Sequence, residues 1–228
     1  MSIVFDQVTK VIGGAAVTDH VSCRFPTGQI TGLQGVNGSG KTMLLRLIAG
    51  LIYPSEGRVV VDGAVLGKDA AFPPSLGVLL EAPAFLPFYT GYDNLRLLAA
   101  VKGTAGPRDI ETALARVGLL DARGKKYRKY SLGMKQRLGI AAAILEHPGL
   151  LLLDEPTNAL DESGVELVKA ILREERDRGA TVVLASHDGA LLGDLAGEIF
   201  SLAAGREDLQ KTTGTPKTPR PWPGAFCA

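Results

Sequence analysis

Residues 35–42, which read Gly-Val-Asn-Gly-Ser-Gly-Lys-Thr, decide the fold of this chain. They follow a short apolar segment, residues 30–33, and precede an apolar-periodic one, residues 43–50. This is the strand–loop–helix context in which the pattern GxxxxGK[ST] binds phosphate. Its glycines let the chain wrap closely around an anion, which then faces successive N–H groups and the helix N-terminus. The stretch therefore predicts a nucleoside triphosphate site.

Two side chains of this loop carry specific chemistry. Lys41 supplies a movable point charge for the β- and γ-phosphates, and the Thr42 hydroxyl suits Mg²⁺. A glycine-rich turn that matches the pattern by chance is the competing interpretation, and the motifs downstream argue against it. The other residues expected to hold the nucleotide in this loop are Gly35, Asn37, Gly38, Ser39 and Gly40.

A second set of residues begins at position 150, where four leucines precede Asp154, Glu155 and a proline. Four apolar residues in a row suit a strand that is buried on both faces of a sheet. Two carboxylates at its C-terminal end suit the ligand-binding edge of an open α/β sheet. We expect Asp154 to hold Mg²⁺ and Glu155 to orient or deprotonate the attacking water. A strand followed by an ordinary acidic turn is the alternative.

Three further motifs follow the phosphate loop along the chain. Residues 130–137 read Tyr-Ser-Leu-Gly-Met-Lys-Gln-Arg, residues 158–161 read Asn-Ala-Leu-Asp, and residues 186–188 read Ser-His-Asp. With the two motifs above, and in this order, they resemble the ATP-binding cassette (ABC) transporter ATPases. The resemblance implies an α/β fold: a P-loop NTPase core of the ABC type, an antiparallel β subdomain and an inserted α-helical subdomain. It also implies ATP as the nucleotide and Mg²⁺ as its cofactor.

The same resemblance assigns roles to four more residues. In the family two such domains pair head to tail and sandwich two ATP molecules. Residues 130–137 resemble a variant of its LSGGQ signature, so Ser131 and Gly133 would contact the γ-phosphate bound by the other chain. His187 resembles the switch histidine that positions the attacking water, and Asp161 resembles the residue that couples the two sites. An ordinary capped helix, a structural histidine and a helix-start aspartate are the competing interpretations.

Outside the variant signature, two further positions depart from the family pattern. Ile12 stands where an aromatic residue usually stacks on adenine, so only apolar contact with the base remains. Glu81 stands where a glutamine usually touches Mg²⁺; a carboxylate is a better ligand but adds negative charge near the phosphates. Glu81, together with Leu-Gly-Met at residues 132–134, resembles exporters of bacitracin, lantibiotics and related peptides. A tolerated Gln-to-Glu change without bearing on the substrate is the alternative.

Composition fits one cytoplasmic domain. The chain has 228 residues, 46% of them hydrophobic, and a formal net charge of +1, which favours neither nucleic acid nor a polybasic membrane anchor. We expect no transmembrane helix and no signal peptide, because the apolar runs are short and the N-terminus already reads as a strand. Cys23 and Cys227 are too isolated to predict a disulfide framework or a metal site.

Local patterns predict the order of the elements. The cassette should span residues 1–206, with its helical subdomain at about 84–148, before a Pro/Thr-rich tail at 207–228. A loop at 103–107 should end with Pro107 opening a helix. Expected strands lie at residues 3–8, 21–25, 29–33, 58–61 and 181–185, and expected helices at 92–101, 110–117, 135–145 and 165–178.

The function implied by the resemblance is that of a transport motor. The chain would hydrolyse ATP, pair with a second copy in an ATP-dependent homodimer, and drive a separate integral membrane permease from the inner face of the membrane. Export of a peptide antibiotic, lantibiotic or other drug-like substrate is expected, with import as the alternative direction. A soluble ABC ATPase of translation or DNA repair, or a slowly hydrolysing switch, are the rival classes. The short interval between Thr42 and Ser131 leaves little room for the inserts that such soluble proteins carry.

Overall fold

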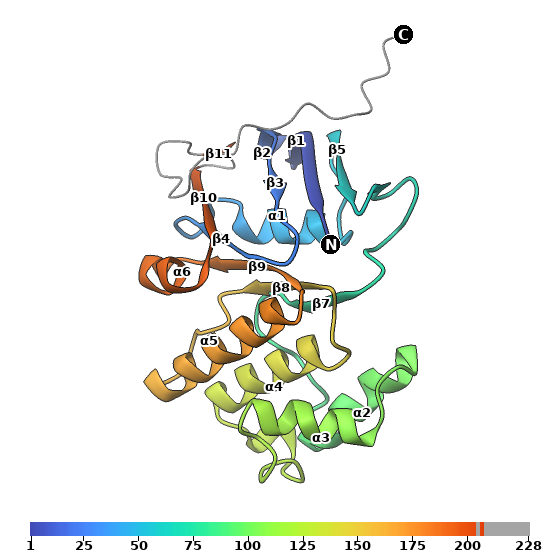
Figure 1. Ribbon diagram of the computed structural model, residues 1–228, viewed down its shortest axis with the longest axis vertical. Helices are drawn as coiled ribbons and strands as arrows, with labels where there is room; N and C mark the ends of the chain where they lie inside the picture. Colours follow the sequence, from blue (N-terminus) through green and yellow to red (C-terminus); the bar gives the residue numbers. More distant parts are fainter. Residues whose placement is uncertain (204–205, 208–228) are drawn as a thin grey trace.

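A computed structural model describes residues 1–203 and 206–207 of the chain. Its elements lie in layers: an antiparallel sheet, helix α1 (Lys41–Ile48), a mostly parallel sheet, and further helices below that sheet (Figure 1). The expected α/β fold class is thus confirmed. Of the predicted tail at 207–228, residues 208–228, with Cys227, lie outside the described residues.

The antiparallel sheet is joined by tight turns. Gly13 and Gly14 connect its first two strands with φ of 58° and 82°, and Asp62 and Gly63 connect another pair with φ of 47° and 86°. Positive φ at both central residues suits the two-residue turns whose twist matches that of a hairpin. The strand order is β2-β1-β5-β6, with β3 also paired to β1. The strands are β1 (Ile3–Ile12), β2 (Ala15–Val21), β3 (Arg24–Phe25), β5 (Glu56–Val61) and β6 (Ala64–Val65).

One expected strand is wrong in its placement. Residues 21–25 were expected to form a single strand, but Val21 ends β2, and β3 pairs separately with β1. Strand β2 itself was missed, because residues 15–21 show no clear alternation of apolar and polar side chains. Its partner β1, across the hairpin turn, stabilises it as a strand.

The second sheet has six strands in the order β11-β10-β4-β9-β8-β7. All neighbours are parallel except the β10–β11 pair, so the carboxyl ends of five strands meet at one edge. Residue 207 belongs to β11, one position beyond the expected boundary at 206. The strands are β4 (Ile30–Gln34), β7 (Leu76–Leu79), β8 (Leu150–Asp154), β9 (Thr181–Ser186), β10 (Glu198–Ala203) and β11 (Arg206–Glu207).

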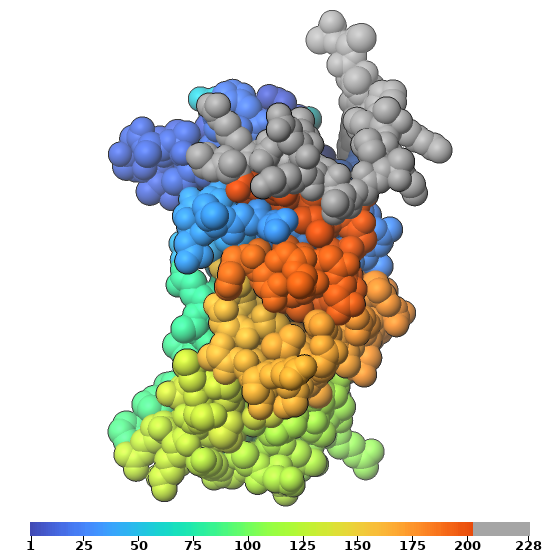
Figure 2. Space-filling model, turned by 90° about the vertical axis from the view of Figure 1, so that its left-hand side faces the viewer, coloured from blue at the N-terminus to red at the C-terminus, as the bar shows by residue number. Residues whose placement is uncertain are grey.

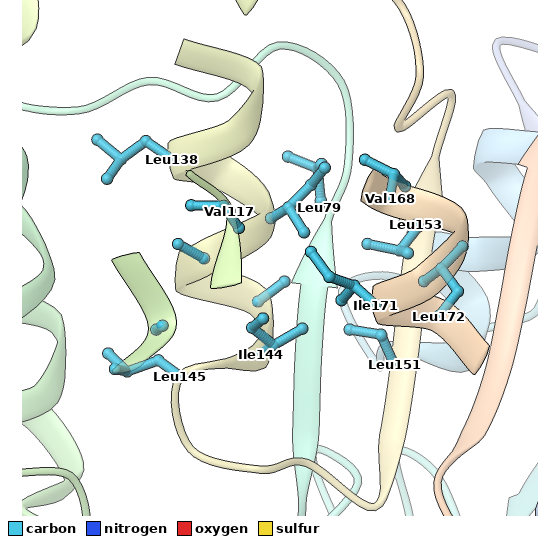
Figure 3. Packing of buried hydrophobic residues seen from close by; sticks show 14 of the residues in the cluster. Leu79, Val117, Leu138, Ile144, Leu145, Leu151, Leu153, Val168, Ile171 and Leu172 are labelled. Atoms are coloured by element: carbon cyan, nitrogen blue, oxygen red, sulfur yellow. The ribbon is translucent and has the colours of Figure 1, made fainter. Parts of the chain in front are cut away.

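Strand β8 divides its leucines between two hydrophobic cores. Leu150 and Leu152 pack with α1 and the antiparallel sheet, whereas Leu151 and Leu153 pack on the side of the lower helices. Figure 3 shows the second core, where Leu151 and Leu153 face side chains of α4 and α5. All four leucines are fully buried, each worth roughly 1.5–3 kcal/mol of burial. Burial of the four leucines therefore holds β8 between the two cores, and with it the carboxylates of Asp154 and Glu155 at its end.

Four helices agree closely with the expected ranges, whereas the short helix after β9 and a short 3₁₀ helix were not predicted. Pro107 is the first residue of its helix, as predicted, and Thr90 caps another by accepting a bond from Asp93 N at 3.0 Å. Helices α2 and α3 lie at the end of the molecule opposite the antiparallel sheet, and Figure 2 shows the same order of segments from the side. These elements are α2 (Gly91–Lys102), α3 (Pro107–Arg116), the short 3₁₀ helix η1 (Tyr127–Lys129), α4 (Leu132–Ile144), α5 (Glu162–Asp177) and α6 (Gly189–Leu195).

Within residues 1–203 and 206–207, no helix combines the length and the apolar character needed to cross a membrane.

Candidate active site

A cleft of about 910 Å³ opens at the carboxyl edge of the parallel sheet. Parts of the chain that are far apart in sequence line it, because parallel strands deliver their following loops to the same edge. The lining residues are Ala16, Val17, Asn37–Met43, Glu81–Pro83, Tyr127, Leu132, Lys135, Gln136, Asp154, Glu155, Asn158 and Ala159. Most of the loop and carboxylate residues predicted from the sequence are thus brought together here.

The phosphate loop connects β4 to α1 and faces the cleft with its backbone. Gly38 and Gly40 have φ of 81° and 102°, a region of backbone conformation that residues with a side chain rarely adopt. A Cβ added at Gly38 would meet nothing within 4 Å, so the loop is open to the cleft at that point. The Ser39 hydroxyl is buried and finds no hydrogen-bond partner in the described part of the chain. An orphaned polar group in a glycine cradle fits a bound anion.

Lys41 is nearly buried at the start of α1. Its Nζ donates hydrogen bonds to the carbonyl oxygens of Gly35 at 2.6 Å and Val36 at 3.1 Å. These bonds hold the ammonium group inside the curve of the loop, where phosphate oxygens are expected. The position fits the predicted role of a point charge for the β- and γ-phosphates.

Thr42 and Asp154 form the candidate magnesium site. The Thr42 hydroxyl donates to Asp154 Oδ2 at 2.5 Å, which joins the start of α1 to the end of β8. Burial raises the pKa of Asp154, against the opposing effect of the Thr42 bond. No group of three His, Cys, Asp or Glu side chains able to hold a metal occurs among the described residues. A hydroxyl and one carboxylate fit Mg²⁺ that takes its other oxygen ligands from phosphate and water.

Glu81 lies at the rim of the same cleft. It follows β7 with a φ of 61°, and its largely exposed carboxylate pairs with Arg46 of α1. This ion pair offsets part of the negative charge that the departure from glutamine adds near the phosphates. Its predicted contact with Mg²⁺ stays a prediction.

Glu155 is held by three groups of the neighbouring strand end. Its carboxylate accepts hydrogen bonds from His187 N at 2.9 Å and Ser186 Oγ at 3.2 Å, and His187 Nδ1 lies 2.9 Å from Glu155 Oε2. The pairing of β8 with β9 sets this arrangement, because Asp154 lies opposite Ala185 in the sheet. The structure therefore unites the predicted base with the predicted switch histidine.

The signature segment and Asp161 both sit at helix starts. Ser131 is the N-cap of α4, as predicted, and accepts a bond from Met134 N at 3.2 Å. Asp161 caps α5, and the bond that it accepts from Gly164 N lowers the pKa of Asp161. Gly133 lies against the backbone of Ala159. The roles of Ser131, Gly133 and Asp161 across a dimer stay predictions.

The residue expected to contact adenine lies outside the cleft lining. Ile12 ends β1, is 46% exposed, and does not line the cleft, whereas Ala16 and Val17 of β2 do. Sequence reasoning also missed Gln136, whose side chain reaches the backbone of Glu155 and Pro156. Its place inside the signature segment was the available signal, but the spacing alone does not show where a helical side chain points.

Comparison with known proteins agrees with this geometry. The sequence profile of the ABC transporter family matches residues 18–158. The uncharacterized ABC transporter ATP-binding protein YybJ of Bacillus subtilis is 50% identical over 79% of this chain and 83% of its own length. The bacitracin transport ATP-binding protein BcrA of Enterococcus faecalis is 38% identical over 80% of this chain, which spans 60% of that relative. The lantibiotic transport ATP-binding protein SrtF of Streptococcus pyogenes is 30% identical over 90% of this chain and 88% of its length.

A solved structure shows the same fold. The ATP-binding cassette MJ0796, described as a dimer in a post-hydrolysis state bound to ADP and Pi, matches with a TM-score of 0.82 at 23% identity. The match covers 90% of this chain and 96% of that one. With its phosphate loop, its paired carboxylates and these relatives, the chain belongs to the ABC transporter family, as one of its ATP-binding, ATP-hydrolysing proteins.

Proposed function

We propose that this chain is the motor subunit of an ABC exporter, in which MgATP hydrolysis drives a separate membrane permease. The observation that carries the proposal is the site around Glu155. A carboxylate held by Ser186 and His187 shares one cleft with Lys41 and with the Thr42–Asp154 pair. Phosphoryl transfer to water needs a positioned base and neutralised phosphate charge, and this cleft supplies groups for both.

Each residue has a distinct task in this proposal. Lys41 binds the β- and γ-phosphates, while Thr42 and Asp154 hold Mg²⁺, which neutralises phosphate charge when bound. Glu155 accepts the proton of the attacking water, and His187 orients that water beside the γ-phosphate. The bonds from Ser186 and His187 N aim the Glu155 carboxylate before the substrate arrives.

The proposed active form is a homodimer. Leu132, directly after the Ser131 cap, is 69% exposed, so an apolar side chain and a helix N-terminus stand together at the cleft rim. A phosphate held by a second copy would complete the first turn of α4, since the N–H groups of a helix start favour anions. Asp161, capping α5 nearby in sequence, is proposed to couple the two sites.

The permease is proposed to dock on the helical end of the molecule. Backbone bonds from Tyr127 N to Tyr89 O at 2.9 Å and from Arg128 N to Pro87 O at 3.0 Å join two loops there. This end of the molecule combines exposed apolar side chains with exposed cations, as a surface for a protein partner would. The apolar members are Leu86, Phe88, Tyr89, Leu97, Leu98 and Val101, and the basic members are Arg123, Lys125, Lys126, Arg128 and Lys129. Such docking would place the chain at the cytoplasmic face of the membrane.

A peptide antibiotic is the proposed cargo class. The names of BcrA and SrtF, which refer to bacitracin and lantibiotic transport, support this choice. The Glu81 and Leu-Gly-Met departures point to the same group of exporters. No observation favours a soluble role in translation or repair.

Reconstitution tests the function. The chain and its permease in liposomes should hydrolyse ATP faster than the chain alone, and Lys41→Ala should remove both rates. Co-expression of the pair in a bacitracin-sensitive strain should raise resistance only with the wild-type chain. Hydrolysis unaffected by the permease would contradict the motor, whereas coupled hydrolysis without resistance would contradict only the cargo.

A further inference from the structure

Helix α4 reaches directly into the turn that carries Glu155. Gln136 Nε2 donates to the carbonyl oxygen of Glu155 at 3.2 Å and to that of Pro156 at 3.1 Å. The Gln136 side chain is 8% exposed, so both bonds lie in a region largely shielded from water. The main-chain oxygens of Glu155 and Pro156 thus both accept hydrogen bonds from the side-chain amide of Gln136 on α4.

The backbone of Glu155 needs such support. Its φ is 47°, in the left-handed region that residues with side chains adopt only when their surroundings enforce it. On one side, Glu155 N donates to Ala185 O of β9 at 2.9 Å. On the other, Glu155 O accepts from Gln136 and from Asn158 N, the latter at 3.2 Å. The sheet therefore binds the main-chain N–H of Glu155, and α4 binds its main-chain carbonyl.

A second contact fits α4 to the same turn. A Cβ added at Gly133 would lie 3.0 Å from Ala159 O, so the start of the helix lies close to the backbone that follows Glu155. Ala159 also has a positive φ, 64°. Close approach at Gly133 brings Gln136, one turn later on α4, within reach of the Glu155 and Pro156 carbonyls.

We propose that Gln136 is a positioning residue for ATP hydrolysis, which acts by holding the main chain of Glu155 so that its carboxylate faces Ser186 and His187. The proposal deepens the proposed function and rests on Glu155 acting as the base. Gln136 lies on the helix that Ser131 caps, so a shift of α4 relative to β8 changes the aim of the base.

Gln136→Met tests this role. Methionine keeps the length and the unbranched shape of the side chain but cannot donate to the two carbonyls. We expect kcat to fall about tenfold or more, because misplacing a catalytic group by about 1 Å can cost two orders of magnitude. The Kd for a fluorescent ATP analogue should stay within about twofold of wild type, since Gln136 acts on the base and not on the phosphate loop. Rates are expressed per bound nucleotide, so that unfolded chains do not contribute.

Gln136→Glu serves as a second variant in case methionine prevents folding. Its carboxylate has the same length but only accepts hydrogen bonds at neutral pH, so the loss in kcat should be at least as large. Asn94→Leu is the matched control. Asn94 is another buried amide that donates to two carbonyls, those of Leu86 and Thr90, but it lies away from Glu155. Its kcat in the isolated chain should match wild type.

A double variant separates positioning from general stability. If Gln136 acts through Glu155, then Gln136→Met should slow wild type but should not further slow Glu155→Gln. A loss of the same factor in both backgrounds would overturn the proposal, and so would normal turnover of Gln136→Met and Gln136→Glu. Normal turnover of Glu155→Gln itself would instead contradict the proposed function. The two failures are therefore distinguishable.

Discussion

Replacing Glu155 by glutamine removes the proposed base while leaving its surroundings in place. The amide has the shape of the carboxylate, and its oxygen can still accept the bond from His187 N, now 2.9 Å long. The new amide nitrogen can donate its two hydrogens to the Ser186 hydroxyl and to His187 Nδ1, which lie 3.2 Å and 2.9 Å from the oxygen that it replaces. What is lost is the ability to take a proton from water.

The magnitude follows from that difference. We expect hydrolysis to slow by about 10²-fold or more, which corresponds to a barrier raised by roughly 2.7 kcal/mol. MgATP binding should persist, because Lys41, Thr42 and Asp154 are unchanged. The free energy of unfolding should shift by less than about 1 kcal/mol, since the hydrogen bonds are largely retained.

Two assays check the expectation. Phosphate release under single and multiple turnover measures the chemical step, and light scattering measures assembly. Without nucleotide both proteins should be mostly monomeric, and with saturating MgATP the variant should persist as a dimer because the trapped nucleotide is not consumed. Glu166→Gln is the matched control, since Glu166 lies on the surface of α5, where it pairs with Lys169.

Two outcomes would refute the reasoning. Turnover of Glu155→Gln within a few-fold of wild type would remove Glu155 from the role of base. A variant that binds MgATP yet stays monomeric would contradict the homodimer in which each site is completed by a second chain.

Three further predictions address other parts of the cleft. Lys41→Ala should lower hydrolysis by about 10²-fold or more, because phosphoryl transfer depends on neutralised charge, and steady-state turnover near wild type would argue against the phosphate site. Asp154→Asn should abolish Mg²⁺-dependent hydrolysis yet raise the Tm of the nucleotide-free chain at pH 7. Because burial raises the pKa of Asp154, its charge destabilises the folded chain at neutral pH, and this destabilisation fades as the pH falls through that pKa. A gain in Tm that grows in acid would contradict this sign. Val17→Tyr, which adds a ring to the cleft lining, should tighten binding of a fluorescent ATP analogue by roughly 1 kcal/mol, about fivefold. Ile12→Tyr should leave the Kd of the analogue within about twofold of wild type. The reverse result would identify Ile12 as the residue that contacts adenine.

Much of the site was predictable because its chemistry is local. The phosphate loop needs glycines, a lysine and a threonine at fixed intervals, and the following helix N-terminus comes with them. The leucine run before Asp154 predicted a strand buried on both faces, which β8 is. Ser131 and Pro107 act at helix starts, where the backbone requirement lies within a few residues of the side chain that meets it.

Other features were decided only when distant segments met. Strand β2 exists through its pairing with β1, and the register of that hairpin puts Val17, not Ile12, in the cleft lining. The contact of Glu155 with His187 depends on β8 lying beside β9 with Asp154 opposite Ala185. Gln136 meets the Glu155 turn because α4 packs across the sheet at that edge.

The amino-acid sequence by itself therefore determined which groups this protein brings to a nucleotide, because those groups sit next to the backbone motifs that present them. The orientation of these groups was decided by tertiary structure. The orientation of Glu155 depends on strand register and helix packing, through partners 19 positions away at Gln136 and 32 positions away at His187. Such long-range pairings leave no periodic trace in the sequence around Glu155, so only the folded chain reveals them.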